Sequence, residues 1–155
     1  MKKYLFILLT LLINEVSALS VSDYQSKLIG RWFVNNDRLC SDPAFSNGGL
    51  IYSYDKKGQL ISELNLPKNS VMSLIRISQV KKFEVIDDSQ NIVKVLSNVQ
   101  SVDKNEFYTT LTISKFDNQF KTFSIIDQKK NDEMIIKNSI NLKSGERQSP
   151  FYKCD

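Results

Sequence analysis

The feature that most constrains the fold is a succession of short runs rich in Val, Ile, Thr, Tyr and Phe, separated by clusters of Asp, Asn, Gly, Ser and Lys. Apolar and polar residues alternate within the runs, which is typical of half-buried β-strands. There are about nine runs, joined by roughly two to six residues, and no helical pattern of useful length interrupts them. The predicted strands cover residues 31–35, 50–54, 59–66, 71–86, 92–99, 107–114, 120–126, 134–142 and 151–154.

These short connections predict an antiparallel meander, because neighbouring strands that are joined by tight turns pair antiparallel. A meander of this length hides its edges best when it closes into a barrel. We therefore expect an all-β fold: an antiparallel up-and-down barrel of about eight to nine strands, with a short N-terminal helical turn before the first strand. The alternation slips near Val80, which predicts a bulge or a bend at that point.

The N-terminus has the pattern of a secretory signal peptide over residues 1–18. A positively charged start at 1–3 precedes an apolar run at 4–13 and a small-residue cleavage site at 16–18. The alternative is a buried N-terminal helix. On the first interpretation the domain covers residues 19–155, no transmembrane span is left after cleavage, and the protein is secreted or periplasmic.

Composition narrows the classes of function. Removing 18 of 155 residues leaves 137, which is enough for one domain with a core of its own. Because Lys2, Lys3 and Glu15 belong to the leader, 21 Lys and Arg become 19, 17 Asp and Glu become 16, and the net charge is +3. The basic residues are spread out, so we expect no nucleic-acid partner. Histidine is absent from the sequence. The usual general base and zinc ligand are therefore missing, and we predict no enzyme, no metal and no cofactor.

The two cysteines, Cys40 and Cys154, predict one disulfide. In an oxidising compartment an even pair is most simply paired with itself. The bond would enclose 113 residues and tie the start of the domain to its end, as a closed sheet with neighbouring first and last strands allows. Two free redox thiols are the alternative, although a redox pair normally has C-x-x-C spacing.

The most specific local motif is Gly30-Arg31-Trp32, which follows a short helical segment at the start of the first strand. A single large indole can plug the bottom of a barrel, while glycine lets the chain approach closely as it enters. With the leader, the meander and the cysteine pair, this motif resembles the G-x-W signature of the lipocalins, in the calycin superfamily. The resemblance implies that a basic side chain from near the end of the barrel, Lys153 or Arg147, covers Trp32.

The family's usual T-D-Y segment and its long C-terminal helix have no counterpart here. A barrel of another calycin branch is therefore an alternative to a true lipocalin. A core tryptophan in an ordinary β-sandwich is a further alternative.

The apolar strand faces lead to a hypothesis about function. A barrel of this size can hold one small apolar molecule, so we predict a small hydrophobic ligand in its interior. The predicted inward-facing, ligand-binding residues are Leu60, Leu64, Ile75, Ile77, Phe107, Leu111, Ile113, Phe123 and Ile125. The same side chains could instead fill the barrel solidly. The alternative function is a protein partner held by the loops at 37–49 and 67–70. A third is an enzyme that uses carboxylates such as Asp87 and Asp88.

Overall fold

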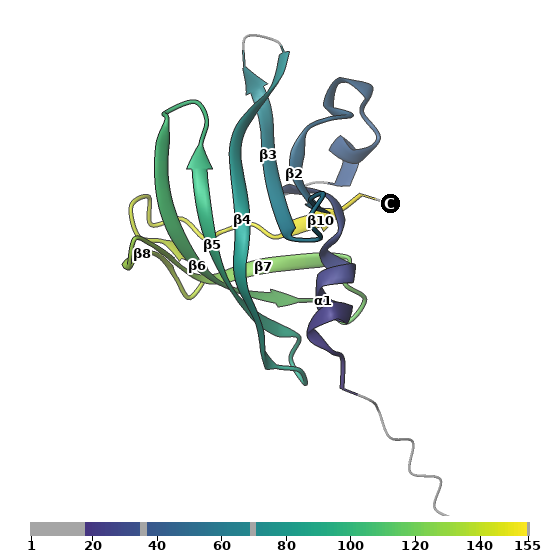
Figure 1. The fold of residues 1–155 in the computed structure, drawn as a ribbon, viewed down its shortest axis with the longest axis vertical. Helices are drawn as coiled ribbons and strands as arrows, with labels where there is room; N and C mark the ends of the chain where they lie inside the picture. Colours follow the sequence, from purple (N-terminus) through teal and green to yellow (C-terminus); the bar gives the residue numbers. More distant parts are fainter. Residues whose placement is uncertain (1–17, 35–36, 69–70, 155) are drawn as a thin grey trace, which may run out of the picture.

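A computed structural model describes residues 18–34, 37–68 and 71–154 (Figure 1). All of the predicted leader except Ala18 lies outside the described residues. The elements are α1 (Val21–Leu28), β1 (Gly30–Val34), the 3-10 helices η1 (Asp37–Cys40) and η2 (Pro43–Phe45), β2 (Gly49–Tyr54), β3 (Leu60–Lys68), β4 (Val71–Asp87), β5 (Ile92–Ser101), β6 (Glu106–Phe116), β7 (Thr122–Lys130), β8 (Glu133–Lys137), β9 (Ile140–Asn141) and β10 (Phe151–Lys153).

Eight of these strands form a closed antiparallel barrel, which confirms the predicted fold class. Strands β1 to β7 pair in sequence order. Strand β10 closes the barrel because it pairs with β1 on one side and with β7 on the other. The register on β10 places Trp32 opposite Lys153 and Phe123 opposite Phe151. The pairing of β4 with β5 shifts between Val80 and Lys82, so the predicted bulge is confirmed.

The predicted strand at 134–142 is instead two strands, β8 and β9, which extend the sheet beyond the barrel. Asn138 and Ser139 divide them, with φ of +50° and +63°. Two successive residues with positive φ make the tight hairpin turn that suits the twist of antiparallel strands. The chain therefore reverses at Asn138, and β10 takes the place beside β7 that a continuous strand would have reached.

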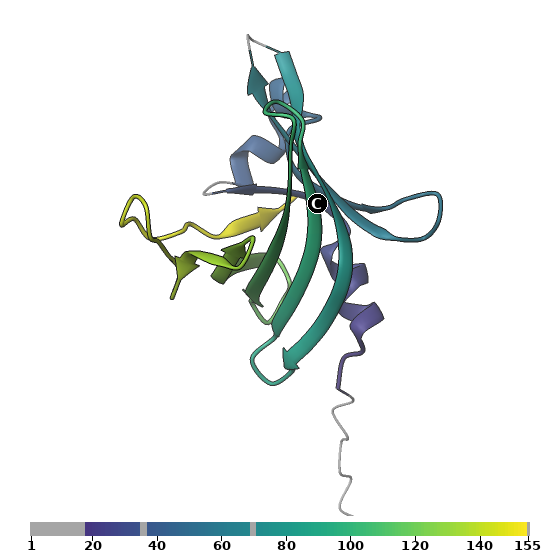
Figure 2. The same cartoon turned by 60° about the vertical axis from the view of Figure 1, so that its left-hand side comes forward.

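Helix α1 closes one end of the barrel, next to the turn between β4 and β5 (Figures 1 and 2). Ser20 caps the helix: its Oγ accepts from Asp23 N at 3.2 Å, and Asp23 Oδ2 accepts from Ser20 N at 2.8 Å. Such a reciprocal box satisfies backbone donors that the first helical turn leaves free. Tyr24 and Leu28 are the buried face of the helix. The helix thus acts as a plug anchored at its start.

The hydrophobic core packs against the buried face of helix α1. Trp32 has no exposed surface, and its ring centroid is 4.9 Å from that of Phe123, in an edge-on arrangement. Tyr24 is also fully buried, and its ring is 5.4 Å from that of Phe120, again edge-on. Aromatic pairs at these separations add stability beyond the area they bury. The closed end is therefore a densely packed aromatic cluster.

The opposite end of the barrel is open. The segment with η1 and η2 and the hairpin between β3 and β4 lie there (Figures 1 and 2). Cys40 and Cys154 are bonded, with an S–S length of 2.04 Å and a Cα–Cα distance of 5.2 Å, so the predicted disulfide is confirmed. It attaches η1 to the residue that follows β10. In the part of the chain that the structure describes, no helix is long and apolar enough to cross a membrane.

Candidate functional site

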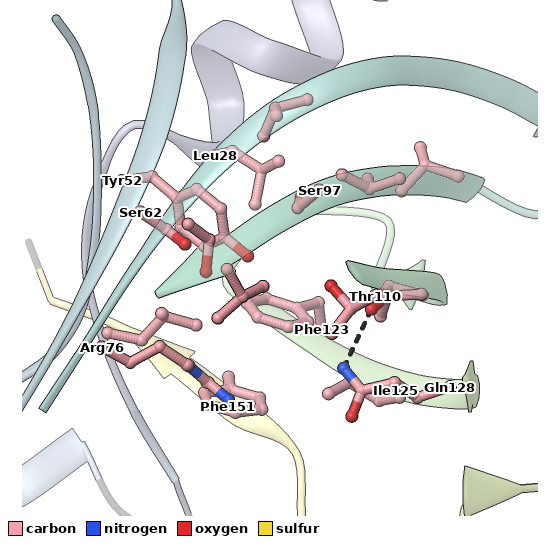
Figure 3. Close-up of a pocket in the computed structure, with 18 of the residues that line it drawn as sticks. Leu28, Tyr52, Ser62, Arg76, Ser97, Thr110, Phe123, Ile125, Gln128 and Phe151 are labelled. Atoms are coloured by element: carbon pink, nitrogen blue, oxygen red, sulfur yellow. Dashed lines mark hydrogen bonds between the residues drawn. The ribbon is translucent and has the colours of Figure 1, made fainter. Parts of the chain in front are cut away.

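The interior of the barrel contains a small hollow of about 80 Å³, which we call the central cavity (Figure 3). Side chains from β2 to β7, β10 and α1 surround it. Its lining is mixed. The apolar part includes Leu50, Val80, Val93, Val95, Phe116, Phe123, Ile125 and Phe151, and the polar part includes Tyr52, Ser62, Arg76, Ser78, Ser97, Thr110, Thr112, Ser114 and Gln128.

Small hydroxyl side chains make up the inward face of β6. Thr110, Thr112 and Ser114 all line the central cavity, and Phe116 closes the row at the end nearest α1. Gln128 on β7 donates through Nε2 to Thr112 Oγ1 at 2.9 Å, which is the dashed line in Figure 3. Five serine and threonine residues on β3, β5 and β6 are buried: Ser62, Ser97, Ser101, Thr110 and Ser114. The barrel interior is therefore a hydrogen-bonding surface as well as an apolar one.

Arg76 brings a positive charge into this interior. It lies on β4, opposite Leu64 of β3 and Ser101 of β5. Its side chain lines the central cavity together with that of Tyr52 (Figure 3). No Asp or Glu is among the described residues around the cavity. Burial raises the pKa of Tyr52 to about 12, while the charge of Arg76 acts in the opposite direction. Tyr52 therefore keeps its proton at neutral pH.

A second hollow, of about 250 Å³, opens at the other end of these strands; we call it the mouth pocket. It lies where β1 and β3 end and where β2, β4 and β10 begin. The connection between β1 and β2 contributes Leu39 and Phe45 to its wall. Its remaining lining is Trp32, Phe33, Val34, Gly49, Leu50, Leu64, Asn65, Leu66, Pro67, Met72 and Phe151. Asn65 is the only polar side chain among these described residues, so the mouth pocket is an apolar surface.

The Gly30-Arg31-Trp32 motif behaves as the resemblance implied. Trp32 Nε1 donates to Leu28 O at 2.8 Å, which satisfies the buried indole. Lys153 is the basic side chain that covers the ring: its Nζ is 5.4 Å from the ring centroid and donates to Lys27 O at 2.6 Å. Gly30 has a φ of +124°, and a Cβ there would lie 3.4 Å from Lys153 Cε. The positive φ therefore favours glycine at this position.

Four of the nine predicted ligand residues lie on the inner side of the barrel. Phe123 and Ile125 line the central cavity, and Leu64 lines the mouth pocket. Leu60 is buried in the aromatic core cluster. The structure thus divides these residues among the core and two hollows instead of gathering them around one.

The predicted inward orientation of the other five, Ile75, Ile77, Phe107, Leu111 and Ile113, is wrong. Their neighbours Arg76, Ser78, Thr110, Thr112 and Ser114 line the interior, and side chains alternate along a strand. Phe107 is 72% exposed. Ile77 and Phe107 line a wide outer groove of about 520 Å³ over β4, β5 and β6. The assumption that apolar faces point inward fails here because many of the inward positions of β4 and β6 carry Arg, Ser and Thr side chains.

The predicted loops and acidic pair also have identifiable contacts. Residues 37–49 and Pro67 contribute to the mouth pocket, whereas 69 and 70 lie outside the described residues. Asp88 Oδ1 accepts from the Tyr24 hydroxyl at 2.9 Å. Asp87 Oδ1 accepts from Ser89 Oγ at 2.6 Å, and this hydrogen bond lowers the pKa of Asp87. Both carboxylates therefore accept hydrogen bonds at the closed end of the barrel.

Comparison with protein-family models, with curated proteins and with solved structures finds no match to this chain. The described residues include no group of three or more His, Cys, Asp or Glu side chains placed to hold a metal ion.

Proposed function

We propose that this chain is a non-catalytic, lipocalin-like binding protein of an oxidising, exported compartment, and that it takes a small, mainly apolar molecule into the open end of its barrel. The mouth pocket carries the proposal. The pocket has a volume of about 250 Å³, and its lining is apolar except for Asn65. Burial of apolar ligand surface there contributes roughly 25 cal/mol for each Å² removed from water.

The size of the two hollows favours the mouth over the barrel centre. Ligand pockets generally have volumes of about 300–1,000 Å³. The central cavity, at about 80 Å³, is well below that range, whereas the mouth pocket, at about 250 Å³, is close to it. An apolar ligand in the central cavity would leave the hydroxyl groups there without hydrogen-bond partners, whereas the same ligand in the mouth pocket would not. The predicted ligand class is thus retained, and its place is moved towards the opening.

The test uses Leu66, which lies in the pocket wall and is 42% exposed. We expect a neutral fluorescent probe such as N-phenyl-1-naphthylamine to bind the oxidised protein saturably, and Leu66→Asp to weaken its binding about tenfold. Val102 is the matched control, because it is equally exposed, at 42%, and does not line the pocket. Val102→Asp should leave probe affinity unchanged. No saturable binding to the unmodified protein, or equal losses in both variants, would contradict the proposal.

The exported compartment is tested separately. Residues 1–18 fused to a reporter that is active only after export, such as alkaline phosphatase, should give activity. Replacing the apolar residues Leu8 and Leu9 with Asp should abolish it. An inactive reporter with the intact segment would contradict the exported location and leave the binding proposal standing.

A protein partner at the open end is the second candidate, because apolar side chains are exposed there. Val34, Leu66 and Val71 are 43%, 42% and 65% exposed. Val71 is not in the lining of the mouth pocket. If a partner docks on this rim, Val71→Asp should abolish a cross-linked complex in the native exported fraction while probe binding is kept. A complex that survives Val71→Asp would contradict docking on this rim.

A further inference from the structure

The charge of Arg76 is unusual for the inside of a barrel. Neither a hydrogen bond nor an ion pair holds its guanidinium within the described residues, and no described carboxylate lines the cavity. A cation in a partly buried site is costly unless an anion or water compensates for its lost hydration. Water can serve this purpose in the free protein. An anionic ligand could replace that water and supply the missing charge.

The groups around Arg76 favour an anion over a neutral polar group. Guanidinium has only donors, and it forms paired hydrogen bonds with planar oxyanions. Tyr52 shares the cavity and holds its proton at neutral pH, because burial raises its pKa to about 12. The hydroxyls of Ser62 and Ser78 line the same space. These side chains together offer several donors and no negative charge.

The position of Arg76 connects this donor cluster to the mouth pocket. Leu50 and Phe151 line both hollows. Leu64, which lines the mouth pocket, is the direct neighbour of Arg76 across the β3–β4 pairing. Arg76 does not line the mouth pocket, but these shared and paired residues make the two hollows neighbours, so an apolar body in the mouth pocket would have the central cavity at its inner end.

We propose that the ligand is an amphipathic organic anion of the carboxylate class, whose charged group binds Arg76 with help from Tyr52 while its apolar body occupies the mouth pocket. This inference rests on the proposed function. It assigns to Arg76 the preference for an anionic over a neutral ligand, since charge-assisted, two-point hydrogen bonds are among the strongest hydrogen bonds in proteins. The apolar wall supplies attraction that does not depend on the headgroup.

The test compares octanoate with 1-octanol, which have the same chain length and differ in charge. Each is titrated against the oxidised protein by displacement of the neutral naphthylamine probe. We expect octanoate to bind at least tenfold more tightly than octanol. Arg76→Gln should remove that preference and leave octanol affinity unchanged, and Tyr52→Phe should reduce it severalfold.

Arg147→Gln is the matched control, because it removes the same charge from an exposed residue outside the barrel strands. It should keep the preference for octanoate. Equal binding of octanoate and octanol by the unmodified protein overturns the inference but leaves the proposed function intact. Loss of the preference in both arginine variants also overturns it, since the effect would then come from net charge. Failure of every probe to bind contradicts the proposed function itself.

The preference for octanoate over 1-octanol is measured on the unmodified protein, so the inference stays testable if a variant does not fold. Circular dichroism and the urea midpoint show whether Arg76→Gln has folded. Arg76→Met provides a second variant of similar length without a charge. Retention of the octanoate preference in a folded Arg76→Met protein would overturn the role of Arg76.

Discussion

The closed end and the open end of this barrel are built from different side chains on the same strands. At the closed end, α1, Trp32 and a group of phenylalanines bury large aromatic rings against one another. Towards the open end, the interior carries hydroxyl groups and an unneutralised arginine, and the rim exposes apolar side chains. Aromatic packing contributes stability, whereas a cation inside a barrel costs it. The contrast predicts that the closed end contributes most of the stability, and it is consistent with the ligand that we propose for the open end.

The largest effect should come from the centre of the closed end. We expect Trp32→Ala to lower the free energy of unfolding by about 3–5 kcal/mol, as for other buried large aromatics. The substitution also leaves Leu28 O without its indole donor and Lys153 without the ring it covers. Urea unfolding followed by circular dichroism measures the loss.

Phe107→Ala is the control for this comparison, because Phe107 is 72% exposed on the outer face. Surface changes of this kind usually stay within about 0.5 kcal/mol. Similar losses for the two aromatic residues would show that the closed end is not the main source of stability.

The disulfide joins the open-end segment to the residue that follows the last strand, and its loss should have the second largest effect. Replacing both Cys40 and Cys154 with Ser should cost about 2–4 kcal/mol, chiefly because the unfolded chain regains the freedom of a long loop. Unfolding of the wild-type protein with and without reductant provides the same comparison without a substitution. An unchanged urea midpoint after full reduction would contradict the prediction.

A smaller effect is expected where α1 meets the β4–β5 turn. The Tyr24 hydroxyl donates to Asp88 Oδ1 at 2.9 Å and lies 3.0 Å from Asn91 Oδ1. Hydrogen bonds to charged groups contribute about 1.5–3 kcal/mol, but water reaches part of this contact, so Tyr24→Phe should cost about 1–2 kcal/mol. Tyr54, which is 46% exposed, is the control. If Tyr54→Phe costs as much as Tyr24→Phe, the helix contact has no special role in stability.

Part of the closed end could be predicted from the sequence, because the Gly30-Arg31-Trp32 motif is a local signal and the resemblance it carries implied a basic side chain over Trp32, which Lys153 supplies. The disulfide could be predicted without a local signal, because the sequence has two cysteines that can pair only with each other. The break between β8 and β9 was missed because Asn138 and Ser139 adopt positive φ without a glycine to mark the turn.

The interior of the open half was misassigned, although the sequence contained a signal for it. Phe83 and Val85 pack against the core on one side of the predicted bulge. A bulge reverses which residues of a strand face inward. Carrying that reversal through Val80 places Ser78 and Arg76 inside, as observed. On β6 no such signal exists, because an inward row of Thr and Ser contradicts the usual pattern of apolar interiors.

The smallest expected effect concerns the pKa values of two tyrosines, Tyr24 at the closed end and Tyr52 in the barrel interior. The pKa of Tyr24 is raised to about 12, first by burial and then by the hydrogen bond to Asp88. The pKa of Tyr52 is also raised to about 12 by burial, but there Arg76 acts in the opposite direction. Both groups are neutral when protonated, so folding favours the protonated form. Their contribution to stability is complete below the unfolded value of 10.0 and is lost as the pH rises through about 12.

Absorbance at 295 nm, which follows tyrosinate, should show two tyrosines of the folded protein that lose their protons at a higher pH than the ordinary tyrosine value of 10.0. Tyr24→Phe and Tyr52→Phe should each remove one of them. Arg76→Gln should move the Tyr52 transition to still higher pH, because it removes the positive charge that stabilises the phenolate, and it should leave the Tyr24 transition in place. A Tyr52 transition that stays put or falls in Arg76→Gln would mean that Arg76 does not act on the barrel interior.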